Sequence, residues 1–159
     1  MTLRKYNYRR KLPHLQKDSK PLFVSFRTHR SWKLPPMLRD IVLECCLYQH
    51  EKSIRLHAAV VMPEHVHLLL SALKDANGES YSIPEIMQSI KSVSAHKINR
   101  VAGRTGKVWQ TESFDHVVCT SREFEAKVTY IAENPLMRRL VNSASAYRWL
   151  WLDSEEFYW

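Results

Sequence analysis

Glycine is scarce in this chain, with three residues among 159, and the first of them is Gly78. A phosphate-binding loop between a strand and a helix depends on closely spaced glycines, so none can form in the first half of the chain. The stretch from Gly103 to Lys107 does not have the spacing of a Walker loop either. The sequence therefore argues against enzymes that hold nucleoside triphosphates or dinucleotides in such loops.

Cysteine and long apolar runs are also scarce. Cys45, Cys46 and Cys119 are an odd number without metal-binding spacing or a disulfide framework, which is typical of a reducing compartment. The N-terminus is polar and cationic and lacks the apolar stretch of a signal peptide. No run approaches the roughly 18 apolar residues of a membrane-spanning helix. We expect a soluble cytoplasmic protein.

The length and charge of the chain limit the number of domains and the kind of partner that it can have. With 159 residues, 45% of them hydrophobic and 25% charged, the chain is long enough for one globular domain and too short for two of ordinary size. Lysine and arginine outnumber the acids by 24 to 16, which gives a net charge of +8. This balance indicates a polyanionic partner, such as nucleic acid or an anionic membrane surface.

Much of the positive charge lies in an N-terminal arm, residues 1–20, which holds a single acid, Asp18, and two tyrosines, Tyr6 and Tyr8. Its cations are Arg4, Lys5, Arg9, Arg10, Lys11, Lys17 and Lys20. Cations interleaved with aromatic rings suit phosphates and unstacked bases, although a solvated basic tail has the same composition. We expect residues 21–159 to form one domain with an aromatic C-terminal tail.

Periodicity from residue 21 onward predicts an order of β-α-β-β-α-β-α. Helices are expected after Pro35-Pro36, from Ser82 toward Gly103, and from Thr120, where Ser82 with Glu85 and Thr120 with Glu123 form capping boxes. Strands are expected at 22–26, 54–62 and 64–70, and 108–119 predicts either a strand pair or one irregular strand. This order favours an α+β, ferredoxin-like sandwich with a mostly antiparallel sheet.

His65 and His67 carry the strongest chemical signal. Residues two apart in a strand project from one face, so the two imidazoles stand side by side while Val66 and Leu68 point to the other face. Such a pair is a two-point metal clamp, or else two structural histidines at a strand end. Because no closely spaced cysteine or histidine completes a zinc tetrahedron, a metal site here would be open.

The third predicted helix offers a possible complement to that pair. Its apolar stripe is separate from a second stripe, which contains Glu123, Lys127, Tyr130 and Asn134 at spacings of four, three and four. Tyr130 is therefore either functional or an amphipathic residue at the margin of the core. Pro135 should stop or kink the helix beside Asn134.

Four motifs occur in order along the chain: 61–70, VMPEHVHLLL; Lys91-Ser92 with 95–99, AHKIN; Trp109-Gln110 through 113–118, SFDHVV; and 130–135, YIAENP. Together they resemble the HUH single-tyrosine transposases, and in particular the REP-associated tyrosine transposases. The resemblance runs from about residue 8 to about residue 150. The chain departs from the family pattern at Glu64, where Asn is usual, and at Met137, Arg138 and Arg139.

The resemblance implies an HUH endonuclease fold, with Tyr130 as the nucleophile and His65, His67 and Asn134 as ligands of Mg²⁺ or Mn²⁺. The implied reaction is nicking and strand transfer on single-stranded or hairpin DNA through a 5′-phosphotyrosine. The implied protein is a monomer or homodimer in the cytoplasm, associated with the bacterial nucleoid and not with a membrane. Two alternatives stay open: a non-catalytic DNA-binding module of the same fold, and a metal-dependent hydrolase of a small anionic substrate.

Several other residues carry weaker hypotheses. Lys91, Lys97 and Arg100 fall on the polar side of the second helix, where they contact either DNA phosphates or only solvent. His57 is interpreted as a neighbour of the metal ligands or an exposed residue, and Asp115 and His116 as hydrogen-bonded structural residues. The tryptophans near the C-terminus are expected to dock onto the domain; they are Trp149, Trp151 and Trp159.

Overall fold

The computed structural model describes residues 9–10 and 20–158. A five-stranded antiparallel sheet lies at its centre, in the order β5-β2-β4-β3-β6. The strands are β2 (Leu22–Thr28), β3 (Ile54–Val61), β4 (His65–Ala72), β5 (Trp109–Val117) and β6 (Leu150–Leu152). Leaving out β6, this is the strand order of a ferredoxin-like sandwich, so the predicted fold class is confirmed.

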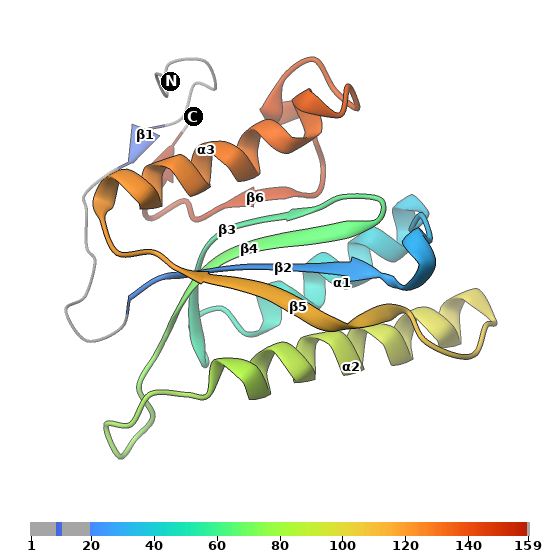
Figure 1. Ribbon diagram of the computed structural model, residues 1–159, viewed down its shortest axis with the longest axis horizontal. Helices are drawn as coiled ribbons and strands as arrows, with labels where there is room; N and C mark the ends of the chain where they lie inside the picture. The colour runs from blue at the N-terminus through green and yellow to red at the C-terminus, as the bar shows by residue number, and fades with distance from the viewer. Residues whose placement is uncertain (1–8, 11–19, 159) are drawn as a thin grey trace.

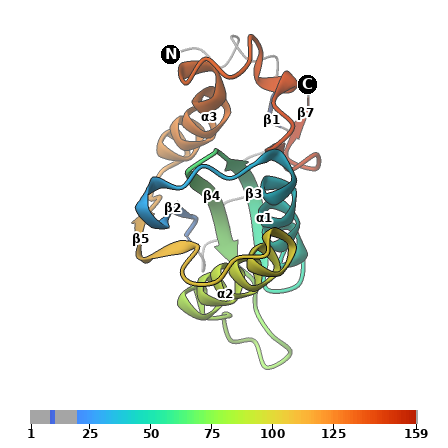
Figure 2. The same cartoon turned by 90° about the vertical axis from the view of Figure 1, so that its right-hand side faces the viewer.

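Three helices cover the two faces of the sheet. They are α1 (Pro36–Tyr48), α2 (Ile83–Ala102) and α3 (Ser121–Met137). Helices α1 and α2 lie on one face and α3 on the other (Figures 1 and 2). Two short 3₁₀ turns, η2 (His29–Ser31) and η3 (Ala144–Ala146), complete the connections.

The helix boundaries follow local chemistry that the sequence shows. The Ser82 hydroxyl accepts a hydrogen bond from the Glu85 amide, and Thr120 accepts one from the Glu123 amide. Gly103 ends α2 at a φ of 60°, in the left-handed region that glycine tolerates best. Helix α3 does not stop at Asn134 but continues through Pro135 to Met137. The predicted stop at Pro135 is therefore wrong.

The core consists of two apolar layers, one on each face of the sheet. Val66 and Leu68 of β4 pack into the layer beneath α1 and α2, whereas Leu69 packs into the layer beneath α3. Because side chains alternate along a strand, His65 and His67 share the face of Leu69. The alternation in the sequence thus places both histidines under α3.

Strand β5 is a single strand rather than a pair. Its register with β2 shifts between Phe26 and Thr28, so the strand is irregular at this point. It lies at one edge of the sheet, and every residue after Trp109 in it is exposed.

None of the helices within residues 20–158 is long and apolar enough to cross a membrane.

The C-terminal segment is part of the domain. Trp149 and Trp151 pack against the core layer of α1 and α2, and β6 extends the sheet beside β3. The final strand, β7 (Phe157–Tyr158), pairs with β1 (Arg9–Arg10), so the basic arm touches the domain at this point. Of the other arm cations, Lys20 is described and exposed, whereas Arg4, Lys5, Lys11 and Lys17 lie outside the described residues, as does Trp159.

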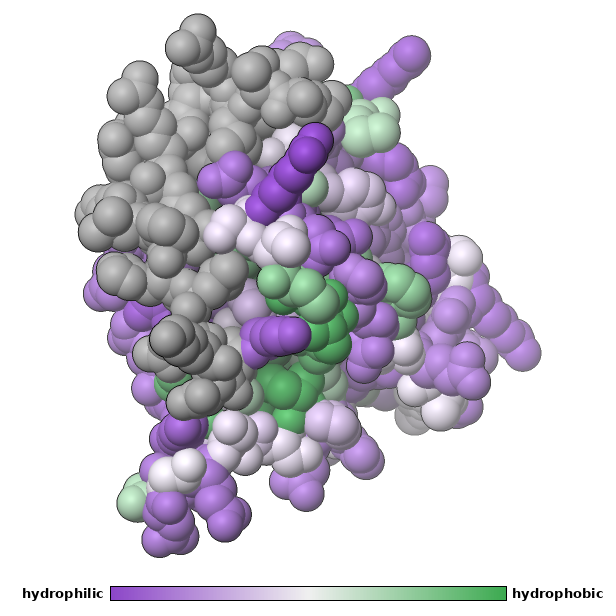
Figure 3. All heavy atoms as spheres, turned by 60° about the vertical axis from the view of Figure 1, so that its left-hand side comes forward, coloured by the Kyte–Doolittle hydropathy of each residue, from purple (hydrophilic) through white to green (hydrophobic). Residues whose placement is uncertain are grey.

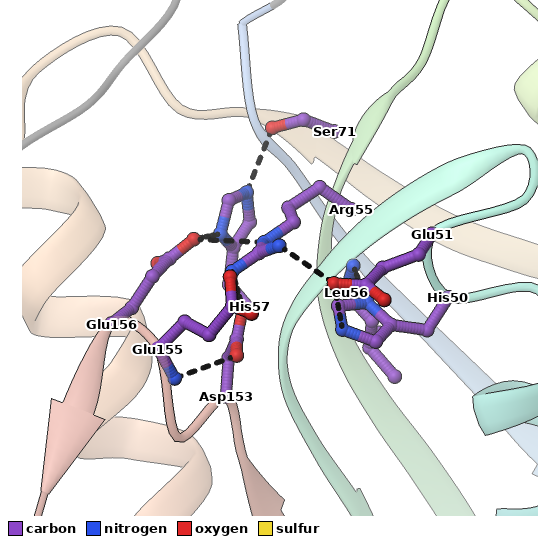
Figure 4. A network of polar contacts seen from close by, with 9 residues as sticks. All are labelled: His50, Glu51, Arg55, Leu56, His57, Ser71, Asp153, Glu155 and Glu156. Carbon is purple, nitrogen blue, oxygen red and sulfur yellow. Dashed lines mark hydrogen bonds and ion pairs between the residues drawn. The ribbon is translucent and has the colours of Figure 1, made fainter.

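His57 belongs to a polar network that attaches this C-terminal segment to β3 (Figure 4). Its Nδ1 lies 2.7 Å from a Glu156 carboxylate oxygen and its Nε2 lies 2.8 Å from Ser71 Oγ. Nearby Arg55 forms ion pairs with Asp153, Glu155 and Glu156. His57 is buried, so neither sequence interpretation was right: it is not exposed, and its partners are not the histidine pair.

A buried hydrogen bond supports the connection between β3 and β4 that carries the histidines. Tyr147 Oη donates to the Val61 carbonyl oxygen at 2.7 Å. Tyr147→Phe should lower the free energy of unfolding by roughly 1 kcal/mol, because the buried carbonyl loses a partner. Urea denaturation followed by circular dichroism measures the change. Tyr81→Phe, at an exposed tyrosine, should leave the urea midpoint unaltered, and equal losses in the two variants would contradict the assignment.

Candidate active site

Two antiparallel strands and one helix bring the predicted site residues together. His65 pairs with Arg27 and His67 pairs with Ser25 across β4 and β2. Above them, α3 supplies Asn134, whose Oδ1 lies 3.3 Å from His65 Nε2. Both imidazoles and the Asn134 side chain are buried.

Tyr130 lies one helical turn before Asn134, on the same side of α3. Its ring centroid is 5.2 Å from that of His67 and 5.8 Å from that of Phe23. Tyr130 is nevertheless 43% exposed, unlike the residues of the α3 apolar stripe. The predicted nucleophile is therefore held by aromatic contacts at the margin of the core while its surface remains accessible.

The Nδ1 atom of each imidazole lies close to an identified side chain. His67 Nδ1 lies 2.5 Å from Ser25 Oγ, and His65 Nδ1 lies 3.3 Å from Glu64 Oε1. His67 Nε2 is buried without a hydrogen-bonding partner, and His65 Nε2 faces Asn134 Oδ1. His65 Nδ1 is also buried without a hydrogen bond, although the Glu64 carboxylate lies beside it. Histidine ligands in metal sites are held in this way, with one nitrogen oriented by a neighbour and the other directed at the ion.

Electrostatics keep these rings neutral. Burial, assisted by the charges of His65, Arg27 and Lys127, lowers the pKa of His67 to about 3. Burial also lowers the pKa of His65 and outweighs the opposing effect of Glu64. A neutral imidazole offers a nitrogen lone pair, so both rings are in the form that binds a metal ion at neutral pH.

The donor set of this site is two imidazoles and one amide oxygen. Imidazole and carbonyl donors with open positions suit a divalent ion that completes its coordination with water or substrate. Within residues 20–158, no group of three histidine, cysteine, aspartate or glutamate side chains is arranged to hold a metal. Asn134 is thus the residue that makes this pair a possible three-ligand site.

Two cations beside the site were not singled out as DNA-binding in the sequence. Arg27 is exposed on β2 opposite His65, and Lys127 Nζ lies 4.4 Å from the Phe23 ring centroid and 6.0 Å from that of Tyr130. The only sequence signal for them is position: Lys127 falls on the Tyr130 stripe, and Arg27 becomes recognisable once the pairing of β2 with β4 is known.

The cations predicted on α2 are not part of this cluster. Lys91, Lys97 and Arg100 belong to the helix that covers the opposite face of the sheet (Figure 2). Lys91 Nζ donates to the carbonyl oxygens of Gln110 and Thr111 and to Ser113 Oγ. Its ammonium group therefore attaches α2 to β5.

Glu64, one of the positions where the chain departs from the family pattern, is paired with another, Arg138. Burial acts to raise the pKa of Glu64, but the hydrogen bond and charge of Arg138, with His65, lower it below its ordinary value. The pair joins the end of α3 to the residue that precedes the histidine pair.

Removing Arg138 should show how much the ion pair with Glu64 contributes to the free energy of unfolding. Arg138→Ala leaves the buried Glu64 carboxylate without its cation, and we expect a loss of about 1–3 kcal/mol in the free energy of unfolding at pH 7. Glu64→Gln in the Arg138→Ala background should recover part of that loss. Urea denaturation compares both with Arg122→Ala, which removes an exposed arginine elsewhere on α3. A stability unchanged by Arg138→Ala would show that the pair contributes nothing.

Comparisons with known proteins bear on this geometry. Residues 28–134 match the family model described as "Transposase IS200 like". That range covers more than half of the chain and contains the histidine pair, Tyr130 and Asn134. A search of the curated proteins found no match.

Among similar solved structures, the first one described here shares the fold. One is described as the REP-associated tyrosine transposase bound to a REP hairpin; it has a TM-score of 0.62 and 19% identity, over 94% of this chain and 82% of that one. A putative transposase from Deinococcus radiodurans has a TM-score of 0.49 and 21% identity, over 78% and 96%. A bacterial tRNA(His) guanylyltransferase-like protein in complex with ATP has a TM-score of 0.44 and 10% identity, over 81% and 66%.

Proposed function

Because the chain belongs to the IS200-like transposase family, we propose that it nicks single-stranded or hairpin DNA and transfers strands through a 5′-phosphotyrosine at Tyr130. The observation that carries this proposal is the placement of one accessible phenol against a buried histidine pair. One chain supplies the histidines, Asn134 and Tyr130 together. The proposed reaction therefore requires no second copy, whether the protein is a monomer or a homodimer.

In the proposed cleavage, Tyr130 Oη attacks the scissile phosphorus and the bond from phosphorus to the DNA O3′ breaks. The phenol loses its proton and the departing O3′ gains one. The product is a 5′-phosphotyrosine with a free 3′-hydroxyl, and attack by a 3′-hydroxyl reverses the step and joins strands. A phenol with a reference pKa near 10 leaves far more readily than a serine alkoxide, so a tyrosine serves both directions.

The residues present fit a divalent ion. We propose that His65 Nε2, His67 Nε2 and Asn134 Oδ1 hold Mg²⁺ or Mn²⁺; the unpartnered, buried His67 Nε2 supports this assignment. When bound, such an ion polarises phosphoryl oxygens and offsets the charge that develops on them. Imidazole donors favour Mn²⁺ in affinity. Ser25 and Glu64 would act on the ligands themselves, by fixing the orientation of the two rings.

DNA as the partner is supported by the family and by the charge of the chain. The structurally similar transposase was solved with a REP hairpin, and we propose a single-stranded or hairpin DNA for this chain as well. We propose that the arm cations add phosphate contacts, and that Lys97 and Arg100 do so on the face of the sheet opposite Tyr130. Contacts of this kind position DNA without reading its sequence.

A small-molecule hydrolase is the less favoured alternative. A cavity of the size that takes a small molecule lies between α2 and β5, lined by Met87, Trp109 and Lys91 among others. It is on the α2 side of the sheet, whereas the histidine pair is on the α3 side. Tyr130 lies instead at the surface, which suits a polymer.

The proposed nucleophile can be tested directly. Tyr130→Phe should abolish a covalent protein–DNA adduct while leaving folding and DNA binding nearly intact, because Tyr130 lies outside the buried stripe of α3. The assay incubates the protein with short DNA hairpins and Mn²⁺ and separates adducts on a denaturing gel. Tyr48→Phe, at an exposed tyrosine of α1, should form adduct normally. Full adduct formation by Tyr130→Phe would exclude the assignment, and DNA cleavage by water in that variant would favour the hydrolase.

The proposed ligands can be tested without activity. His65→Ala and His67→Ala should each remove measurable Mn²⁺ binding, and Asn134→Ala should weaken it less completely. Ser25→Ala should reduce Mn²⁺ affinity by about 10- to 100-fold, because His67 loses the neighbour that orients it. Isothermal titration calorimetry measures each affinity, with His96→Ala as a control at an exposed histidine. Unaltered Mn²⁺ affinity in both histidine variants would show that the ion, if bound, lies elsewhere.

A further inference from the structure

On the sheet face that carries the site, no helix among the described residues 20–158 packs against the outer strand β5. Helix α3 packs mainly against β3 and β4, which leaves the outer strand β5 open on this side. Phe114, in the middle of β5, is 60% exposed. An aromatic ring this exposed contributes little to folding, so its position relative to the site matters.

The direction of Phe114 follows from its neighbours. Ser113 accepts a hydrogen bond from Lys91 of α2, and Asp115 lines the cavity beside α2, so both face the α2 side. Because side chains alternate along a strand, Phe114 and His116 face the opposite side, where α3 and Tyr130 lie.

The strand register places Phe114 in line with the candidate metal ligands. Phe114 pairs with Ser25 across β5 and β2, and Ser25 pairs with His67 across β2 and β4. Neighbouring strands are about 4.8 Å apart, so the backbone of Phe114 lies about 10 Å from that of His67, on the same face. His116 pairs in the same way with Phe23, whose ring contacts both His67 and Tyr130.

Two cations lie beside the line of residues that runs from Phe114 through Ser25 to His67. Arg27 follows Ser25 by two residues on β2, so it faces the same side of the sheet. Lys127 lies over the Phe23 ring. An exposed ring flanked by cations, on an open surface that leads to a nucleophile, has the composition of a single-strand binding site. Figure 3 shows the side on which β2 begins and β5 ends, where apolar side chains gather within a largely hydrophilic surface.

We propose that Phe114 is the platform on which a base of single-stranded DNA stacks as the strand enters the Tyr130 site, with Arg27 and Lys127 binding the adjoining phosphates. The proposal rests on the proposed function and adds the path of the strand. The strand crosses the sheet from β5 over β2 to β4, so that stacking holds the scissile phosphate at Tyr130. Phe114 is in this sense a positioning residue.

Stacking is tested by comparing a strand that has bases with one that lacks them. In the Tyr130→Phe protein with EDTA, fluorescence anisotropy measures the affinity for an oligothymidylate and for an abasic strand of the same length. Phe114→Ala should weaken binding to the oligothymidylate about tenfold and leave binding to the abasic strand unchanged. Phe114→Trp should retain the affinity of the parent for both strands.

Val117→Ala is the matched control. Val117 lies on the same strand and is 47% exposed, but it faces the α2 side, so its loss should alter neither affinity. An equal loss on both strands in Phe114→Ala, no loss on either, or no base-dependent binding by the parent protein would each overturn the proposal. Because this assay requires neither cleavage nor metal, it is independent of the adduct assay. Absence of an adduct in the unaltered protein would refute the proposed reaction without affecting the stacking measurement.

Discussion

The burial of two imidazoles beneath α3 is the constraint on which the rest of the site depends. Strand β4 is flanked by β2 and β3, and both its faces are covered at the histidines. A buried imidazole is costly when charged and costly when its nitrogens lack partners. Here the first cost is avoided because both rings are neutral. The second is met in part: Ser25 partners His67 Nδ1 and Asn134 partners His65 Nε2, whereas His67 Nε2 and His65 Nδ1 are buried without a hydrogen bond. The unpartnered His67 Nε2, beside the contact between His65 Nε2 and Asn134 Oδ1, is the structural basis of the proposed metal site.

Local patterns in the sequence were sufficient to predict which faces of the strand and the helix carry the candidate site residues. The alternation around His65 and His67 predicted that they share one face, and the two helical stripes predicted that Tyr130 and Asn134 lie on one side of α3. These predictions rely on the periods of a strand and a helix, which hold whatever surrounds them. The capping residues Ser82 and Thr120 marked helix starts for the same reason: the partner of each cap is three residues away.

What the sequence could not show are relations between distant segments. Arg27 is close to His65 only because β2 pairs with β4, and Phe114 aligns with His67 only through Ser25. Lys91 looked like a solvent-facing or phosphate-binding cation, but its ammonium group donates to a strand about twenty residues further along the chain. Strand β6 was missed because Leu150–Leu152 is too short to show an alternation. The departures at Glu64 and Arg138 looked independent in the sequence, and the structure shows that they form one ion pair.

The position of α3 on the sheet connects these features with the kind of substrate that the site can serve. If α3 lay over the centre of the sheet, it would cover β2 and β5, and Tyr130 would be buried along with the histidines. Because α3 packs mainly over β3 and β4, Asn134 reaches His65 while Tyr130, one turn earlier, remains at the boundary between the covered and open halves of the face. The ligands are thereby shielded from water and the phenol is not. In the proposed function, a long DNA strand lies along the open half of this face and places a single phosphate at the boundary, beside Tyr130.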